Sequence, residues 1–223
     1  MHLSHVTTFV MALTLPAAGA SAAELIVNGG FETGSFTAIG GAITTYDLIS
    51  AGDPAALTGW SAGNSLVWGL NTTDINTHTG QGFVDLTGVG DTRPHGILNQ
   101  TIATIIGQQY SFSVFATQDF TGSTGFSVFA NAISLVLSGT PGFWDYTPTG
   151  ATYGQLSSVF TADATSTTIS IVGATLGSRQ FMIGLDDVSV TGPVPATVPV
   201  PAGLPLLAAG LGALAALRRR TRV

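Results

Sequence analysis

The sequence predicts an all-β protein in which two antiparallel sheets pack face to face as a β-sandwich of the jelly-roll kind. Between Glu24 and Gly192, no stretch of ten or more residues places apolar side chains at helical spacing, whereas many short runs alternate between apolar and polar residues. Gly, Asn, Asp and Thr bound most of these runs, as is typical of strands joined by turns. The chain has 223 residues, which is room for one such domain with processing segments at its ends.

Nine runs of this region have the two-residue period of a strand. In chain order they are 25–27, 83–86, 96–102, 109–116, 125–130, 133–137, 155–160, 167–172 and 183–190. In the last run, we expect Val188 and Val190 to share a face with Asp186, because side chains of a strand repeat every two residues. An apolar face that carries a carboxylate needs a counter-charge or a ligand.

The first 23 residues predict a secretory signal peptide. An apolar stretch from Val6 to Pro16 is followed by small residues up to Ala23, and we expect cleavage after Ala22 or Ala23. The segment has no Lys or Arg before the apolar stretch, which departs from the usual pattern. The alternative is a buried first helix, but Pro16 and Gly19 would break it.

The C-terminal residues divide into three parts. Residues 193–202 contain four prolines and predict a stiff extended linker, residues 203–217 carry no charge and predict a short transmembrane helix, and residues 218–223 form a basic cytoplasmic tail. A helix of residues 203–217 is about 22 Å long, which is short for a bilayer core of about 30 Å. The span is therefore marginal, and the basic tail orients it with the preceding domain outside the cytoplasm.

The charge distribution excludes nucleic-acid binding. Only 8% of residues are charged, and apart from the C-terminal arginines the chain has Arg93 and Arg179 against twelve acids, a net of 2 − 12 = −10. Such a field repels phosphate backbones. The absence of Cys also excludes disulfide frameworks, thiolate zinc sites and cysteine nucleophiles.

The C-terminal parts together resemble the PEP-CTERM sorting tail in its VPLPA-like form. The motif is Val198, Pro199, Val200, Pro201 and Ala202, followed by the apolar segment and the cluster Arg218, Arg219 and Arg220. Val200 replaces the more usual Leu. The resemblance implies a Gram-negative bacterium that makes extracellular polysaccharide, and an exosortase-type processing enzyme that cleaves near this motif. The protein would be anchored in the inner membrane before processing and would then reach the periplasm, cell surface or matrix. The alternative is a plain membrane anchor.

The order of motifs in residues 24–192 resembles the galactose-binding-like jelly-roll superfamily, which includes many carbohydrate-binding modules. The motifs are Asn28-Gly-Gly-Phe-Glu32, Gly59-Trp60, Gly80-Gln-Gly-Phe-Val-Asp-Leu86, Gly107-Gln-Gln-Tyr-Ser-Phe112 and Leu185-Asp-Asp-Val-Ser-Val190. The resemblance implies a structural Ca²⁺ held by Glu32 and Asp186, with Asp187 as second choice and backbone carbonyls near Asn28. The alternative is that Glu32 and Asp186 cap turns by accepting backbone N–H bonds.

The residues favour a binding protein over an enzyme. The chain has no G-x-S-x-G, H-E-x-x-H or phosphate-loop motif, and its acids lie in turn-rich loops where acids are common anyway. Sugar binding needs flat aromatic faces beside polar groups, and the candidates are Trp144, Tyr146 and Trp68. We expect an exported, envelope-tethered, non-catalytic protein that binds or organises extracellular polysaccharide. The alternative is a structural or adhesive surface protein without sugar specificity.

Overall fold

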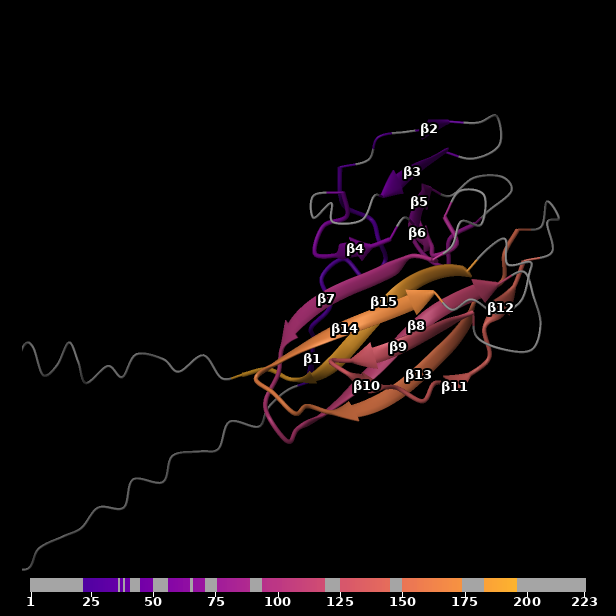
Figure 1. The fold of residues 1–223 in the computed structure, drawn as a ribbon. Helices are drawn as coiled ribbons and strands as arrows, with labels where there is room; N and C mark the ends of the chain where they lie inside the picture. Colours follow the sequence, from indigo (N-terminus) through magenta and orange to yellow (C-terminus); the bar gives the residue numbers. More distant parts are fainter. Residues whose placement is uncertain are drawn as a thin grey trace, which may run out of the picture.

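The computed structural model describes residues 22–35, 37, 39–40, 45–49, 56–64, 66–70, 76–88, 94–118, 125–144, 150–173 and 183–195, and these form two sheets (Figure 1). The ten-stranded sheet has the order β11 (Ser138–Gly139), β13 (Gly154–Thr161), β8 (Gln109–Gln118), β15 (Ile183–Pro193), β6 (Gly82–Asp85), β5 (Leu66–Leu70), β3 (Thr45–Ile49) and β2 (Ile39–Gly40). Two further strands join it: β1 (Ala22–Glu24) pairs with β15, and β12 (Gly142–Phe143) pairs with β8. The five-stranded sheet has the order β10 (Ile133–Ser134), β9 (Phe126–Ala130), β14 (Ser166–Gly173), β7 (Ile97–Ala103) and β4 (Ser61–Gly63).

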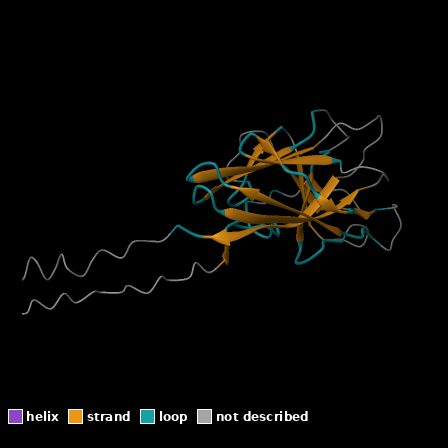
Figure 2. Cartoon of the chain, turned by 90° about the horizontal axis from the view of Figure 1, so that it is seen from below, coloured by secondary structure: helices purple, strands orange, loops and turns teal. Residues whose placement is uncertain are grey.

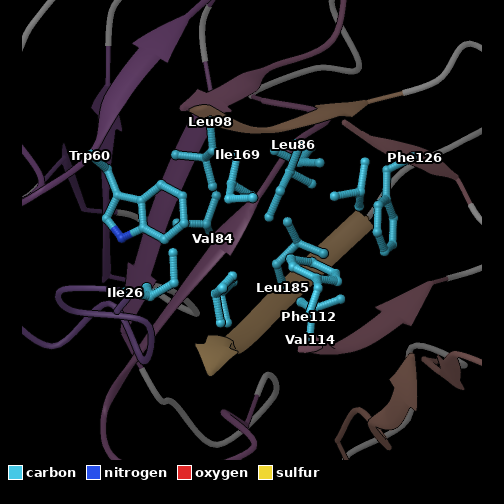
Figure 3. Close-up of a cluster of buried hydrophobic side chains, with 14 of the residues drawn as sticks. Ile26, Trp60, Val84, Leu86, Leu98, Phe112, Val114, Phe126, Ile169 and Leu185 are labelled. Atoms are coloured by element: carbon cyan, nitrogen blue, oxygen red, sulfur yellow. The ribbon is translucent and has the colours of Figure 1, made fainter. Parts of the chain in front are cut away.

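The two sheets enclose one hydrophobic core, as the alternation in β8 illustrates. Tyr110, Phe112 and Val114 are buried on the inner face, whereas Ser111 and Ser113 point outward. Figure 3 shows side chains of both sheets meeting, among them Val84 and Leu185 of the larger sheet and Leu98 and Ile169 of the smaller one. The predicted antiparallel β-sandwich is therefore confirmed for the described residues, with β12 and β8 as a parallel pair. Figure 2 shows strands and loops only.

Most strands that the periodicity predicts form within one or two residues of the expected ends, and two predictions fail. Residues 25–27 are not a strand; instead β1 comes just before them and includes Ala22 and Ala23, the end of the predicted signal segment. Of the run 133–137, only Ile133–Ser134 is paired as β10. The strands β2, β3, β4, β5, β11 and β12 were not predicted; Ala62 and Gly63 interrupt the alternation in β4 and Gly69 interrupts it in β5, while β2, β11 and β12 have only two residues each.

A β-bulge in β15 overturns the prediction that Asp186 shares a face with Val190. Asp186 lies opposite Phe115 and Ser189 opposite Ser113, so three residues of β15 span two of β8. Asp187 occupies the bulge with a φ of 46°. The extra residue shifts the alternation, so Val190 faces the core opposite Phe112 whereas Asp186 lies on the outer face of the sheet.

Both ends of the described chain lie at one end of the sandwich. Ala22 pairs with Pro193, and Thr191 lies opposite Ser111 near the start of β8. Gln118 at the other end of β8 lies opposite Ile183 and beside Phe143. We call the Gln118 end of the ten-stranded sheet the distal end; Figure 1 shows it on the right at β12, with β1 on the left.

Several expectations fall outside the described residues. These are the signal segment up to residue 21, the sorting motif Val198–Ala202, the predicted membrane helix 203–217, and Arg218, Arg219 and Arg220. Within the ranges that the structure describes, there is no helix long and apolar enough to cross a membrane.

Candidate binding site at the distal end

Three carboxylates gather around Gly30 at the distal end. A Cβ atom on Gly30 would lie 3.1 Å from Asp187 Oδ1 and 3.8 Å from Asp186 Oδ1, and Cγ of Glu32 would lie 3.8 Å from it. The N-terminal turn and the bulge of β15 therefore bring together Glu32, Asp186 and Asp187, which the resemblance had grouped. A side chain at position 30 would crowd them.

Asp186 is fully buried, and its carboxylate binds backbone N–H groups of the turn of residues 76–80. Its Oδ2 atom accepts hydrogen bonds from the backbone N–H groups of His78 at 2.8 Å and Thr79 at 3.0 Å. Its Oδ1 atom accepts from the N–H of Asp187 at 2.7 Å. Both oxygens are thus satisfied by backbone donors, as the turn-capping interpretation predicts.

Asp187 is partly exposed, and its carboxylate contacts side chains of the same turn. Its Oδ2 atom lies 2.6 Å from His78 Nδ1, and Thr79 Oγ1 donates to both carboxylate oxygens at 2.8 and 2.9 Å. The His78 ring stacks on Phe115 with centroids 3.6 Å apart and planes at 13°. The side chains of His78 and Asp187 keep 30% and 28% of their surface exposed, so both reach solvent.

Glu32 binds the residues that follow this turn, Gln81 and Gly82. Its carboxylate accepts from the backbone N–H groups of Gln81 and Gly82, at distances from 2.9 to 3.0 Å. Gly80 has a φ of 58°, and a Cβ there would lie 2.1 Å from Glu32 Oε1. Glycine is therefore required at position 80 for this contact. Residues 76–82 are held to the domain by three acids.

Burial changes the acid–base properties of two groups here. The pKa of Asp186 is raised from its ordinary value of 3.8 to about 7; burial is the largest cause and the charge of Asp187 acts in the same direction, while the N–H groups of Thr79, Asp187 and His78 lower it. Burial also raises the pKa of Tyr153, with smaller contributions from Asp186, Asp85 and Asp187. The Tyr153 phenol is therefore protonated at neutral pH.

The predicted calcium ligands fit only in part. Carboxylates suit Ca²⁺, but Glu32 and Asp186 both accept backbone N–H bonds. The carbonyl of Asn28 accepts from Phe31 N–H and, at 3.0 Å, from Trp60 Nε1. Among the described residues, no group of three or more His, Asp or Glu side chains is arranged to hold a metal ion. Calcium binding stays a prediction.

Aromatic side chains lie on the same outer face as the acids. Phe115 is opposite Asp186, and Tyr153 lies on this face because the next residue, Gly154, pairs with inward-facing Ala116. The His78 and Tyr153 rings are 5.9 Å apart. Gly142 pairs with Thr117, and Trp144 N–H donates to the Gln118 carbonyl at 3.0 Å, so the strand period places half-buried Trp144 on this face too.

Of the other sequence candidates, Trp68 belongs to the core. It is 3% exposed, and its Nε1 donates to the Phe31 carbonyl at 2.8 Å. Its ring therefore offers no face to a ligand, and the prediction that it binds sugar is wrong for this structure. Tyr146 lies outside the described residues.

Three buried oxygen atoms near this face have no hydrogen-bond partner. They are Tyr153 OH, Asn76 Oδ1 and Thr117 Oγ1, and Thr117 is fully buried. In the row of residues across the sheet, Thr117 pairs with Gly184, which pairs with Asp85. Leaving such groups unpaired costs about 1 to 3 kcal/mol each. All three atoms are buried, so none of them is open to solvent in this structure.

A separate groove of about 800 Å³ lies along the edge of β13, toward the end where the described chain begins and ends. Serine and aliphatic side chains line most of it, including Ile133, Val136 and Val159, which are exposed. Its lining has no Trp or Tyr and one acid, Asp163. The two Phe residues that line it, Phe112 and Phe160, are buried in the core, so the groove offers no exposed ring for stacking on a sugar.

A scan against protein-family models finds no match to this chain. A search of curated proteins finds none either. Among solved structures, one described as "CBM4 structure and function" has 18% identity and a TM-score of 0.36, with 74% of this chain and 98% of that chain covered. A second, TmCBM61 in complex with beta-1,4-galactotriose, has 14% identity and a TM-score of 0.27, with 75% of this chain and 97% of that chain covered. Similarity at this level assigns neither a family nor a ligand to this chain.

Proposed function

We propose that this protein is a non-catalytic polysaccharide-binding protein that works outside the cytoplasm. The observation that carries the proposal is the distal end, where the rings of Trp144, Tyr153 and Phe115 share one face with the Asp187 carboxylate. Sugar rings stack on aromatic faces, and carboxylates and hydroxyls bind their hydroxyl groups. The half-buried Trp144 ring supplies the first kind of contact, because the His78 ring already covers Phe115, and the partly exposed acid supplies the second.

Export and sorting rest on the sequence. The signal-like residues 1–23 and the resemblance of Val198–Ala202, the apolar segment and the arginine cluster to a PEP-CTERM tail support an exported protein. In this proposal, an exosortase-type enzyme processes an inner-membrane intermediate, and the domain then works in the periplasm, at the cell surface or in the matrix of a Gram-negative bacterium. Expression with and without residues 198–223, followed by fractionation of the cells, tests this part.

Calcium is the proposed structural cofactor at Glu32, Asp186 and Asp187. The support is electrostatic: the described ranges contain no Lys or Arg, and within them the one side chain paired with these three acids that can carry a positive charge is the His78 imidazole beside Asp187. A divalent cation relieves the repulsion between adjacent carboxylates. Binding requires that the carboxylate oxygens share or exchange their backbone donors.

The experiment that tests sugar binding compares alanine substitutions at two adjacent aromatic residues. The full chain in mild detergent is passed over immobilised polysaccharides, together with Trp144→Ala and Phe143→Ala. Phe143 is the matched control because it is 43% exposed and next in sequence, but on the opposite face of the strand. We expect Trp144→Ala to weaken retention by about tenfold or more, taking the roughly 1 to 3 kcal/mol of nucleobase stacking on an aromatic ring as the scale for stacking of a sugar.

Two results contradict this proposal. Equal retention of Trp144→Ala and the wild type shows that the distal face is not the binding surface. Failure to retain the wild-type chain on any glycan favours a structural or adhesive surface protein without sugar specificity.

A further inference from the structure

We infer that two copies of this chain pair edge to edge through strand β13, with Val159 of each copy opposite Thr161 of the other. Sugar binding plays no part in this self-association. Three features of the molecule support it: the open edge of β13, the apolar groove beside that edge, and the spacing of the free backbone groups along it.

The outer edge of β13 is free over its last residues. β8 pairs with the whole of one side of β13, whereas β11 reaches only Leu156 and Ser157 on the other side. Among the described residues, no strand continues along this second side to Thr161. The free part, residues 158–161, contains no proline, no charge and no bulge, which are features that keep many edge strands from pairing with another chain. This edge is therefore open to a further strand.

The free backbone groups at this edge belong to Val159 and Thr161. Ala162 faces β8, because its N–H donates to the Gln108 carbonyl at 3.0 Å and its carbonyl accepts from Gly107 N–H at 2.8 Å. Backbone groups of successive residues in a strand point to alternate sides, so those of Val159 and Thr161 point away from β8. Neither residue has a backbone partner on that side within the described part of the chain. Each therefore offers one donor and one acceptor to an added strand.

The apolar groove of about 800 Å³ lies beside this free edge. Seven large hydrophobic residues are exposed in the described ranges, and three of them line the groove. These are Ile133, Val136 and Val159, with exposed fractions of 52%, 86% and 58%. Covering their side chains removes apolar surface from water, which favours association. The groove therefore rewards a partner that brings aliphatic side chains along with its backbone.

A second copy supplies such a strand in one symmetric register. The two β13 strands run antiparallel, and the two-fold axis passes between the two Phe160 residues. Val159 of each copy then lies opposite Thr161 of the other, and every free N–H of one copy meets a free C=O of the other. A register shifted toward Ser157 would place the second copy on groups that β11 already pairs. The free groups are thus complementary to themselves.

The charges of the chain also favour contact at this place. The described ranges contain seven acids and no Lys or Arg, so two copies repel each other over most of that surface. The groove lining has one acid, Asp163, which accepts a hydrogen bond from Asn131 at 2.7 Å. Two copies therefore approach with least repulsion along this edge. The lining has 17 residues, somewhat fewer than the roughly 20 to 30 per side of a standard interface, so we expect a weak dimer with a Kd on the order of 10 µM.

Disulfide cross-linking of the full chain in mild detergent tests the register, because the chain has no Cys of its own. Val159→Cys and Thr161→Cys are prepared separately, and each is oxidised alone and after mixing in equal amounts. Residues of a hydrogen-bonded pair have Cα atoms about 5.5 Å apart, which a disulfide spans. Two copies of the same residue are diagonal neighbours at about 7 to 8 Å, which is too far. We expect several times more cross-linked dimer in the mixture than in either preparation alone.

Sedimentation velocity of the full chain in the same detergent measures the association itself. Val159→Lys places a charge on the open edge, which opposes strand pairing. Val27→Lys is the matched control, because Val27 is 56% exposed, close to the 58% of Val159, and lies outside the groove. We expect the wild type and Val27→Lys to change from monomer to dimer between about 1 and 100 µM, and Val159→Lys to associate at least about tenfold more weakly.

Four results overturn the inference. Equal cross-linking of the mixture and of one preparation alone contradicts the register. A wild type that stays monomeric at about 100 µM contradicts self-association. Dimerisation of Val159→Lys as tight as that of Val27→Lys shows that another surface, such as the apolar residues 203–217, joins the copies. A monomer in which the amides of Val159 and Thr161 are protected from hydrogen exchange shows that another segment of the same chain covers the edge.

Discussion

Stability should fall as pH rises from about 4 to about 7 because of one residue, Asp186, and Asp186→Asn should remove that dependence. Burial raises the pKa of Asp186 from 3.8 to about 7, so the folded state binds its proton more tightly than the unfolded state does. The contribution of this group is therefore fully present below about pH 4 and is lost by about pH 7. Three pKa units at 1.36 kcal/mol each give an upper limit of about 4 kcal/mol for this loss.

The assay is urea unfolding of the full chain between about pH 4 and pH 8, for the wild type and for Asp186→Asn. Other acids titrate in both proteins, so the difference between the two free energies of unfolding isolates Asp186. Asparagine loses one acceptor for three backbone donors, which costs a constant amount at every pH. We expect the difference to shift in favour of the variant by about 1 to 4 kcal/mol from acid to alkaline pH. Parallel pH profiles for the two proteins refute the reasoning.

Two further predictions concern the N-terminal turn and the proposed cation. Phe31→Ala should lower the free energy of unfolding by about 3 to 5 kcal/mol, because the Phe31 ring is fully buried against Trp60. Denaturant unfolding measures this loss. A loss below about 1 kcal/mol contradicts the packing. Adding about 10 mM Ca²⁺ at pH 8 should stabilise the wild type by about 2 kcal/mol and so raise its melting temperature, and it should stabilise Asp187→Asn less. An unchanged melting temperature in calcium and in chelator leaves turn capping as the sole role of these acids.

The strands that the sequence predicts well are those whose side chains alternate without interruption. Runs such as 109–116 and 155–160 bury every second residue, so the hydrophobic period is visible in the chain. Leu66–Leu70 is buried at three positions and contains Gly69, so its alternation is broken. The bulge at Asp187 depends on a single residue with positive φ, which no periodicity reveals.

The site was predictable in part. The resemblance grouped Glu32, Asp186 and Asp187, and the structure brings them together at Gly30. Its partners were not predictable, because His78 and Asp187 are separated by 109 positions in the chain and Glu32 and Gln81 by 49. The amide groups that satisfy Asp186 belong to the backbone and leave no trace in the sequence. Trp68 shows the same limit, because a Trp side chain suits a sugar-binding position, whereas its neighbours in the fold bury it.

The pairing of Ala22 with Pro193 sets the direction in which the domain can be displayed. Both ends of the described chain lie beside the first residues of β8, and Trp144 lies beside its last residue. About 30 Å of strand therefore separates Trp144 from these two ends. An anchor attached through residues beyond Pro195 would therefore leave Trp144 at the end of the sandwich that faces away from the anchor. Lengthening the predicted proline-rich linker would then move Trp144 farther from the anchored surface and closer to a polymer.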